Sequence, residues 1–281
     1  QNRKMDLINE IKKMSRSSVS RFADVYGKKI STDEIIKVIH DQGFKKKKDD
    51  IQSLVSYINS DLQGEMQEIL KRENEILKGK IDKYVADFEG SIKSELMSLN
   101  GPNISFSFDA TRAFASGLVG LAAYGGLALW ASTLGNLGAY ILVAKGVSLL
   151  SALGISVGGT AAAASTVAAL GGPVVLGVAI AIIAAISLFT VLSGGWEKSI
   201  AKKIVKEYDS NNCLMKYKEN IEKYWSDTET AFGAAANSLE NEWKQYVKNL
   251  REMLSTYNVR EIQSRIEMAK EFKNFLAGIP L

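Results

Sequence analysis

The sequence predicts an all-α protein, built as an elongated antiparallel helical bundle (a stalk) with a hydrophobic helical tip. The 281 residues contain only three Pro and little strand-like alternation outside the centre, which favours helices over strands. Two charged stretches also place apolar residues at helical spacing over long distances. Between Arg112 and Glu197 lie 84 residues with one charged side chain, Lys145, although charged residues make up 23% of the chain. We therefore divide the chain into a first arm (1–108), a hydrophobic tip or paddle (109–195) and a return arm (196–281).

The first arm contains three predicted helices. The first covers 3–26 and ends at Gly27, because glycine commonly follows a helix terminus. The second covers about 33–41, with Ser31 or Thr32 as its N-cap and acidic residues in its first turn. A loop with a lysine run follows. The third helix keeps one apolar seam up to Asn100, along Ile51, Val55, Ile58, Leu62, Met66, Ile69, Leu77, Ile81, Tyr84, Phe88, Ile92, Leu96 and Leu99.

The return arm repeats this pattern in its own residues. A long apolar stripe runs from Tyr217 to Tyr257, and a last helix over about 259–276 is expected to bury Ile262, Ile266, Ala269, Phe272 and Leu276. Neither helix can bury its long apolar stripe alone. Sustained 3-4 spacing with charged neighbours is typical of helices packed in a bundle. We therefore expect the two arms to pack antiparallel, with the uncharged residues at one tip.

Composition excludes several classes of function. The net charge of +4 is spread evenly over the two arms, so we expect no nucleic-acid partner. The run Lys45–Lys48 is followed at once by Asp49 and Asp50. Such a run is more often a solvated turn, and its functional alternative is weak attraction to anionic lipid headgroups.

The chain also shows no recognisable catalytic motif. It has one His and one Cys, which cannot form a His/Cys metal site or an intrachain disulfide. His40 lies in an amphipathic stretch and is expected at the surface, and no phosphate-binding GxxxxGK[ST] loop occurs. We predict no catalytic residue, no metal and no cofactor within this chain. A lone Cys213 fits a reducing compartment, which favours a cytoplasmic protein.

Glycines divide the uncharged residues into four pieces. Of the 23 Gly in the chain, 15 lie between Ala113 and Gly195. We expect apolar helices over 109–131 and 137–153, a small-residue stretch over 160–170, and a most hydrophobic helix over 173–192. This last helix has Pro at its first position, and its length of about 30 Å matches a hydrocarbon core.

We expect these residues to engage a membrane, because a free-standing uncharged tip has few polar side chains to cover it. The alternatives are a buried core or partner interface, and a constitutive transmembrane hairpin. Membrane insertion is predicted for Leu118, Leu121, Leu127, Leu129, Trp130, Val174, Val175, Leu176, Val178, Ile180, Ile182, Ile183, Ile186, Leu188, Phe189 and Leu192. Contact with the membrane interface is predicted for Tyr140, Lys145, Trp196, Lys198, Lys202, Lys203 and Lys206.

Residues 194–206 (GGWEKSIAKKIVK), together with Lys223-Tyr224-Trp225 and the aromatic stripe after it, resemble the return from tip to trunk in bacterial dynamin-like proteins of the LeoA type. The resemblance implies a neck and trunk with a hydrophobic tip, peripheral on a membrane, and a GTPase head that binds GTP upstream of this chain. The chain opens Gln1-Asn2-Arg3-Lys4 without an initiator Met, so we expect residues upstream. Implied partners are a lipid membrane, the GTPase head, and further copies or partner helices.

A second family has a similar arrangement. The α-helical pore-forming toxins pack a hydrophobic hairpin against a long helical bundle, and this alternative implies a secreted protein. A third hypothesis is a helical scaffold whose apolar tip docks a protein partner. The residues upstream would separate the first two, because a P-loop points to a dynamin-like protein and a secretory signal points to a toxin.

Overall fold

A computed structural model gives the fold and describes residues 2–100, 108–118, 127, 195–256 and 259–277. Within these ranges the chain forms seven α-helices and no strand. The all-α prediction is therefore confirmed for the described part of the chain.

The helices of the first arm follow the predicted order. They are α1 (Asn2–Lys29), α2 (Thr32–Asp41) and α3 (Lys48–Asn100). Ser31 caps α2, because its side chain accepts a hydrogen bond from the Glu34 backbone N–H. The predicted end of the first helix at Gly27 was wrong, since α1 continues to Lys29. A glycine inside a helix lowers stability but does not by itself end the helix.

The return arm consists of α9 (Trp196–Ser210), α10 (Cys213–Thr256) and α11 (Val259–Ala277). The break between α9 and α10 was not predicted. It falls at Asn211 and Asn212, and Asn212 has a φ of 51°, a left-handed conformation that asparagine adopts more readily than most residues. The buried residues Tyr208 and Cys213 on its two sides are five positions apart, a step that departs from the three- or four-residue helical spacing.

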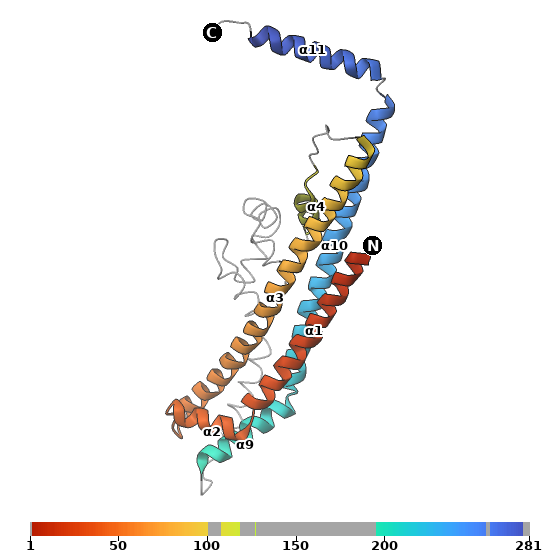
Figure 1. Cartoon of the computed structure of the whole chain (residues 1–281). Helices are drawn as coiled ribbons and strands as arrows, with labels where there is room; N and C mark the ends of the chain where they lie inside the picture. The colour runs from red at the N-terminus through yellow and green to blue at the C-terminus, as the bar shows by residue number, and fades with distance from the viewer. Residues whose placement is uncertain (1, 101–107, 119–126, 128–194, 257–258, 278–281) are drawn as a thin grey trace.

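Helix α1 packs against both α3 and α10, and the three helices follow one long axis (Figure 1). Their facing apolar residues form one core, with Phe22, Leu54, Leu62, Phe232 and Leu239 fully buried. Helix α1 runs antiparallel to both neighbours. Against α3 the ion pairs are Lys29–Asp61, Glu10–Lys80 and Arg3–Asp87, and against α10 the contacts include Phe22–Tyr217, Ser18–Trp225 and Lys12–Glu229.

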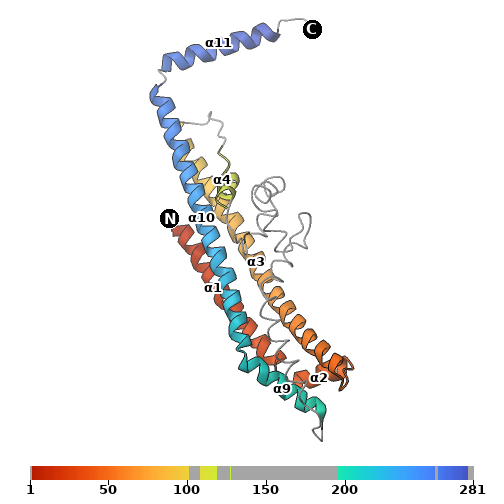
Figure 2. The ribbon, with the colours of Figure 1, turned by 180° about the vertical axis from the view of Figure 1, so that it is seen from behind.

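The two long arms, however, run in the same direction. Residue numbers rise together along their contacts, in the pairs Asn59–Tyr208, Asn74–Tyr224 and Tyr84–Phe232. The expectation that these arms pack antiparallel was therefore wrong. The same 3-4 spacing serves parallel and antiparallel helices equally well, and α1 supplies the antiparallel partner for both. As a consequence, α3 ends and α9 begins at opposite ends of the bundle, as the view from behind also shows (Figure 2).

The last helix does not join the core. Helix α11 turns away from the end of α10 (Figure 2), and every described side chain from 263 to 274 is exposed. Ile266 is 50% and Phe272 is 63% exposed, so their predicted burial was wrong, as was that of Ala269. The amphipathic pattern identified the helix correctly, but it could not say whether a partner lies within the chain.

Candidate functional site

The uncharged segment, residues 113–196, begins in a short helix that is attached to the bundle. Helix α4 (Ala110–Ser116) packs against α10 and α3. Phe114 is fully buried, with its ring centroid 6.1 Å from that of Tyr84 and 5.8 Å from that of Phe232. These tilted pairs stabilise the contact beyond simple burial of area. The start of the segment is thus part of the core.

A glycine allows α4 to approach α10 closely. A Cβ atom added to Gly117 would lie 2.6 Å from Ala235 Cα and 2.7 Å from the Ala234 carbonyl oxygen. The small residues of α10 at this level, Ala234 to Ala236, leave room for the approach. Only glycine fits here without moving one of the two helices.

Polar contacts surround the apolar contact. The Ser116 hydroxyl lies 2.8 Å from Ser238 Oγ, 2.8 Å from the Ala113 carbonyl oxygen and 2.5 Å from Glu242 Oε1. A hydroxyl has one proton to donate and can accept from a second hydroxyl. At the other end of α4, Asp109 caps the helix by accepting a hydrogen bond from the Arg112 backbone N–H at 2.8 Å.

An aromatic cluster precedes α4. The Phe108 ring lies 5.4 Å from the Trp243 ring and 5.7 Å from the Tyr246 ring, which stack on each other at 5.9 Å. A shallow pocket beside it is lined by Phe108, Asp109, Arg112, Glu242, Gln245, Tyr246 and Asn249. We call residues 108–118 with their partners on α3 and α10 the α4 dock.

Burial sets the electrostatics of the α4 dock. Burial and, to a smaller extent, the nearby charge of Glu240 together raise the pKa of Tyr84 to about 12. The phenol therefore stays neutral at physiological pH. The contact surface of the α4 dock combines buried aromatic and alanine side chains with a rim of serine and carboxylate groups, which suits the binding of an apolar helix.

Two of the residues that were predicted to insert into a membrane are described, and only Leu118 belongs to the α4 dock. Leu118 and Leu127 are both fully buried within the core, so they would have to leave it before they could reach lipid. The other fourteen predicted insertion residues lie outside the described residues. The predicted helix over 109–131 was also wrong in its extent, because α4 ends at Ser116 and Gly117 caps it.

The predicted interface residues on α9 are described in full. Trp196 is partly buried against the core. Lys198, Lys202 and Lys206 are exposed, and Lys203 is half-buried. The predicted interface residues Tyr140 and Lys145 lie outside the described part of the chain.

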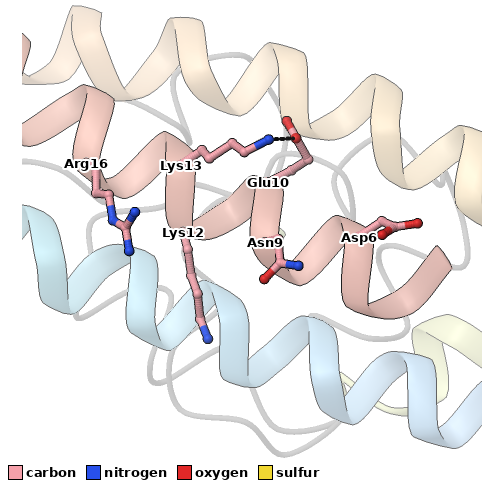
Figure 3. A pocket seen from close by; sticks show the side chains of 6 residues that line it. All are labelled: Asp6, Asn9, Glu10, Lys12, Lys13 and Arg16. Carbon is pink, nitrogen blue, oxygen red and sulfur yellow. Dashed lines mark hydrogen bonds and ion pairs between the residues drawn. The ribbon is translucent and has the colours of Figure 1, made fainter. Parts of the chain in front are cut away.

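The outer face of α1 forms a second shallow pocket (Figure 3). Its lining residues all come from this helix and are Asp6, Asn9, Glu10, Lys12, Lys13 and Arg16. Glu10 accepts hydrogen bonds from Lys13 at 2.7 Å and from Lys80 at 3.0 Å, and both lower the pKa of its carboxyl group. Exposed pairs of this kind contribute little to stability. A single helix face with paired charges of both signs is a solvated surface.

Comparisons with known proteins add no assignment, since no family model, curated protein or solved structure matches this chain. Among the residues that the structure describes, no group of three or more His, Cys, Asp or Glu side chains could hold a metal ion. No helix within the same residues has the length and hydropathy to cross a membrane.

Sequence reasoning missed Phe108, Phe114 and Gly117 as the residues that attach the uncharged segment. One signal could have identified them. Asp109 is an N-cap residue, and Gly117 follows it after seven residues, which is the spacing of a short capped helix. The spacing shows where a helix begins and ends, but it does not show which surface that helix binds.

Proposed function

We propose that this chain is the helical stalk and membrane-engaging hydrophobic segment of a bacterial dynamin-like, membrane-remodelling protein whose GTPase head lies outside the chain. The observation that carries the proposal is the uncharged segment itself, which has one charge in 84 residues and is carried by arms rich in charge. Segments of this composition belong in a protein interior, a partner interface or a bilayer. The protein would act on the membrane from the cytoplasmic side.

The α4 dock supports a conditional role for the segment. It holds the first residues of the segment on the bundle through one aromatic side chain and a few small ones. A contact of this size is strong enough to fix a resting position and small enough to open by local unfolding. The start of the segment would then have a docked form, with residues 108–118 on the bundle, and a detached form in which these residues are also free to reach lipid.

The bundle would act as a rigid arm. Helix α3 has 53 residues, which at 1.5 Å per residue corresponds to about 80 Å. Such a stalk, bound to a nucleotide-driven head, would carry motion from the head to the membrane. Self-association of stalks, or helices of a partner, would provide the surface for remodelling.

Charges placed in the middle of residues 173–192 test the proposal. We expect the Ile182→Asp/Ile183→Asp variant to lose flotation with liposomes, because an Asp in mid-bilayer costs roughly 2.5–3.5 kcal/mol on insertion scales. The matched control is Ile182→Leu/Ile183→Leu, which keeps the apolar character and should float normally. Flotation of the Asp variant at the parent level would contradict insertion.

A folding measurement separates insertion from burial. Circular dichroism during urea titration of both variants would report whether the substitutions unfold the bundle. A bundle that unfolds cooperatively at the parent urea concentration, together with lost flotation, is the expected result. Loss of the folded bundle would instead favour a buried core, because aspartate in a protein interior is strongly destabilising.

The second candidate is a component of an α-helical pore-forming toxin, which the same uncharged segment on a helical bundle favours. The two candidates predict different effects on liposomes. A remodelling protein should deform vesicles into tubes, visible by electron microscopy, without releasing an enclosed dye. A toxin component should release the dye without forming tubes.

A further inference from the structure

One end of the bundle gathers lysines from two distant parts of the sequence. The loop between α2 and α3, α2 itself and α9 all lie at this end, opposite to the end where α3 terminates (Figure 1). Seven exposed lysines lie on the loop, the first residue of α3 and α9. We call them the lysine end: Lys45, Lys46, Lys47, Lys48, Lys198, Lys202 and Lys206.

Apolar packing brings the two groups together. Ile35 and Ile39 of α2 are buried, as are Ala201 and Ile204 of α9, and the two helices are in contact. The lysines of α9 recur every fourth residue, which places them on one stripe beside this buried face. Two lysine groups about 150 residues apart in sequence thereby share one end of the molecule.

The charge at this end is not neutralised locally. Residues 27–50 and 196–213 contain eleven lysines and eight carboxylates, whereas the rest of the chain is almost balanced. None of the seven lysines has a carboxylate within 4.0 Å among the residues that the structure describes. Asp50, two residues after the run, accepts a hydrogen bond from the Lys45 backbone N–H at 2.8 Å.

The uncharged segment returns to the bundle at the same end. Only Ser193 and Gly194 separate the most hydrophobic stretch, 173–192, from Gly195, the N-cap of α9. The three steps from Leu192 to Gly195 span at most about 11 Å. If residues 173–192 enter a bilayer, their C-terminal end must therefore lie close to the lysine end.

We propose that the lysine end is a docking surface for a layer of anionic lipid headgroups, such as phosphatidylserine. This inference rests on the proposed function and adds the lipid class to it. Lysine ammonium groups are strongly hydrated point charges on flexible stems, which suits a diffuse negative surface. Each lysine held near such a surface increases binding about fivefold, and half-buried Trp196 starts α9 where an amphipathic ring favours the interface.

Flotation with vesicles of two compositions tests the proposal. One set is pure phosphatidylcholine, and the other contains equal parts of phosphatidylcholine and phosphatidylserine. The first variant is Lys198→Gln/Lys202→Gln/Lys206→Gln, and the second replaces Lys45–Lys48 by glutamine. The matched control is Lys71→Gln/Lys83→Gln/Lys244→Gln, which removes three exposed lysines from α3 and α10 and changes the net charge by the same amount as the first variant.

We expect the parent and the control to bind the phosphatidylserine vesicles at least tenfold more strongly than the neutral vesicles at low salt. Each lysine-end variant should lose at least tenfold of that binding, and high salt should remove the difference by screening. Equal binding of the parent to both vesicles, or undiminished binding of the lysine-end variants, would overturn the proposal.

The two proposals fail in different ways. If the Ile182→Asp/Ile183→Asp variant loses binding to neutral vesicles while the lysine-end variants bind normally, insertion stands and the lysine end is wrong. If the Asp variant floats as the parent does while the lysine-end variants lose binding, the lysine end stands and insertion is wrong.

Discussion

Adding one methyl group at Gly117 gives the sharpest test of the α4 dock. The backbone at this residue has φ −69° and ψ −14°, which alanine adopts without strain. Any cost of Gly117→Ala is therefore steric. The new Cβ would lie 2.6 Å from Ala235 Cα, 2.7 Å from the Ala234 carbonyl oxygen and 2.8 Å from Ser238 Cβ. The two shortest of these contacts are with backbone atoms, which cannot rotate away.

The magnitude follows from two opposing effects. Excess volume in a packed core costs about 1–3 kcal/mol, and replacing glycine by alanine returns at most about 1 kcal/mol through the lower entropy of the unfolded chain. We expect a net loss of about 1–2 kcal/mol in the free energy that holds α4 on α10. Such a loss corresponds to roughly a tenfold increase in the detached population.

Gly233→Ala is the matched control. Gly233 lies within α10, directly before Ala234, and an added Cβ would meet no atom within 4 Å. The same chemical change should therefore stabilise the bundle by about 0.5–1 kcal/mol, because a glycine inside a helix is less favourable than alanine. The two substitutions are predicted to act with opposite sign.

Limited trypsin digestion measures the effect directly. Arg112 lies within α4, and cleavage after it requires the helix to detach and unfold locally. Mass spectrometry should show cleavage after Arg112 about tenfold faster in Gly117→Ala than in the parent, with no acceleration in Gly233→Ala. If Gly117→Ala is cleaved no faster than the parent, the close approach of α4 to α10 is refuted.

Three further predictions concern the core. Phe114→Ala should lower the free energy of unfolding by about 3–5 kcal/mol in urea titrations, and a loss well below this would mean that the ring is not packed. Asn74 donates a 2.6 Å hydrogen bond to Tyr224 Oη inside the core. Asn74→Leu should therefore lower the free energy of unfolding by about 1–3 kcal/mol, and the double variant with Tyr224→Phe should recover most of this loss. Additive losses in the double variant would argue against the hydrogen bond. Burial raises the pKa of the Cys213 thiol from 9.0 to about 11. Above about pH 9 the folded state keeps a thiol proton that the unfolded state releases. The thiol should therefore not affect the free energy of unfolding below about pH 9, and this free energy should fall as the pH rises towards about 11. Urea midpoints that stay unchanged over that range, or rapid alkylation of Cys213 at pH 8 without denaturant, would contradict its burial.

The helices themselves could be predicted because each has its own periodic signal. The seam from Ile51 to Ile92 is buried at most of its positions, and the N-cap of α2 was identified from its residue type. Polar residues inside the seam could not be interpreted in the same way. Glu73 and Asn74 interrupt the stripe, yet both are buried, because Arg21 lies 3.1 Å from Glu73 and Tyr224 accepts from Asn74.

The relative direction of the helices could not be predicted from the spacing. Apolar residues every three or four positions define a face, and that face is the same whichever way a neighbour runs. The order α1, α3, α10 suggested two arms joined by a tip, but α1 packs between them in an antiparallel sense and leaves α3 parallel to α10. The α4 dock was missed for a related reason, since its partners on α10, among them Phe232, Ala235 and Trp243, belong to the apolar stripe that was expected to pack against the other arm.

The parallel arrangement separates the docking of α4 from the membrane entry of residues 173–192. If the uncharged segment formed a hairpin tip, these two events would take place together. Leu127 is also buried in the core, and 45 residues lie between Leu127 and Pro173. At up to about 3.3 Å per extended residue they can span roughly 150 Å, almost twice the length of α3. Residues 173–192 can therefore enter a bilayer beside the lysine end while α4 stays docked.

Gly117→Ala should accordingly leave the flotation that depends on Ile182 and Ile183 unchanged, although it detaches α4. The reason is that detachment frees only the start of the uncharged segment, whereas residues 173–192 are already linked to the lysine end by Ser193 and Gly194. Flotation of Gly117→Ala, Gly233→Ala and the parent on the same vesicles checks this. A marked increase in vesicle binding by Gly117→Ala alone would mean that the α4 dock restrains the whole segment. Membrane entry of residues 173–192 would then depend on detachment of α4.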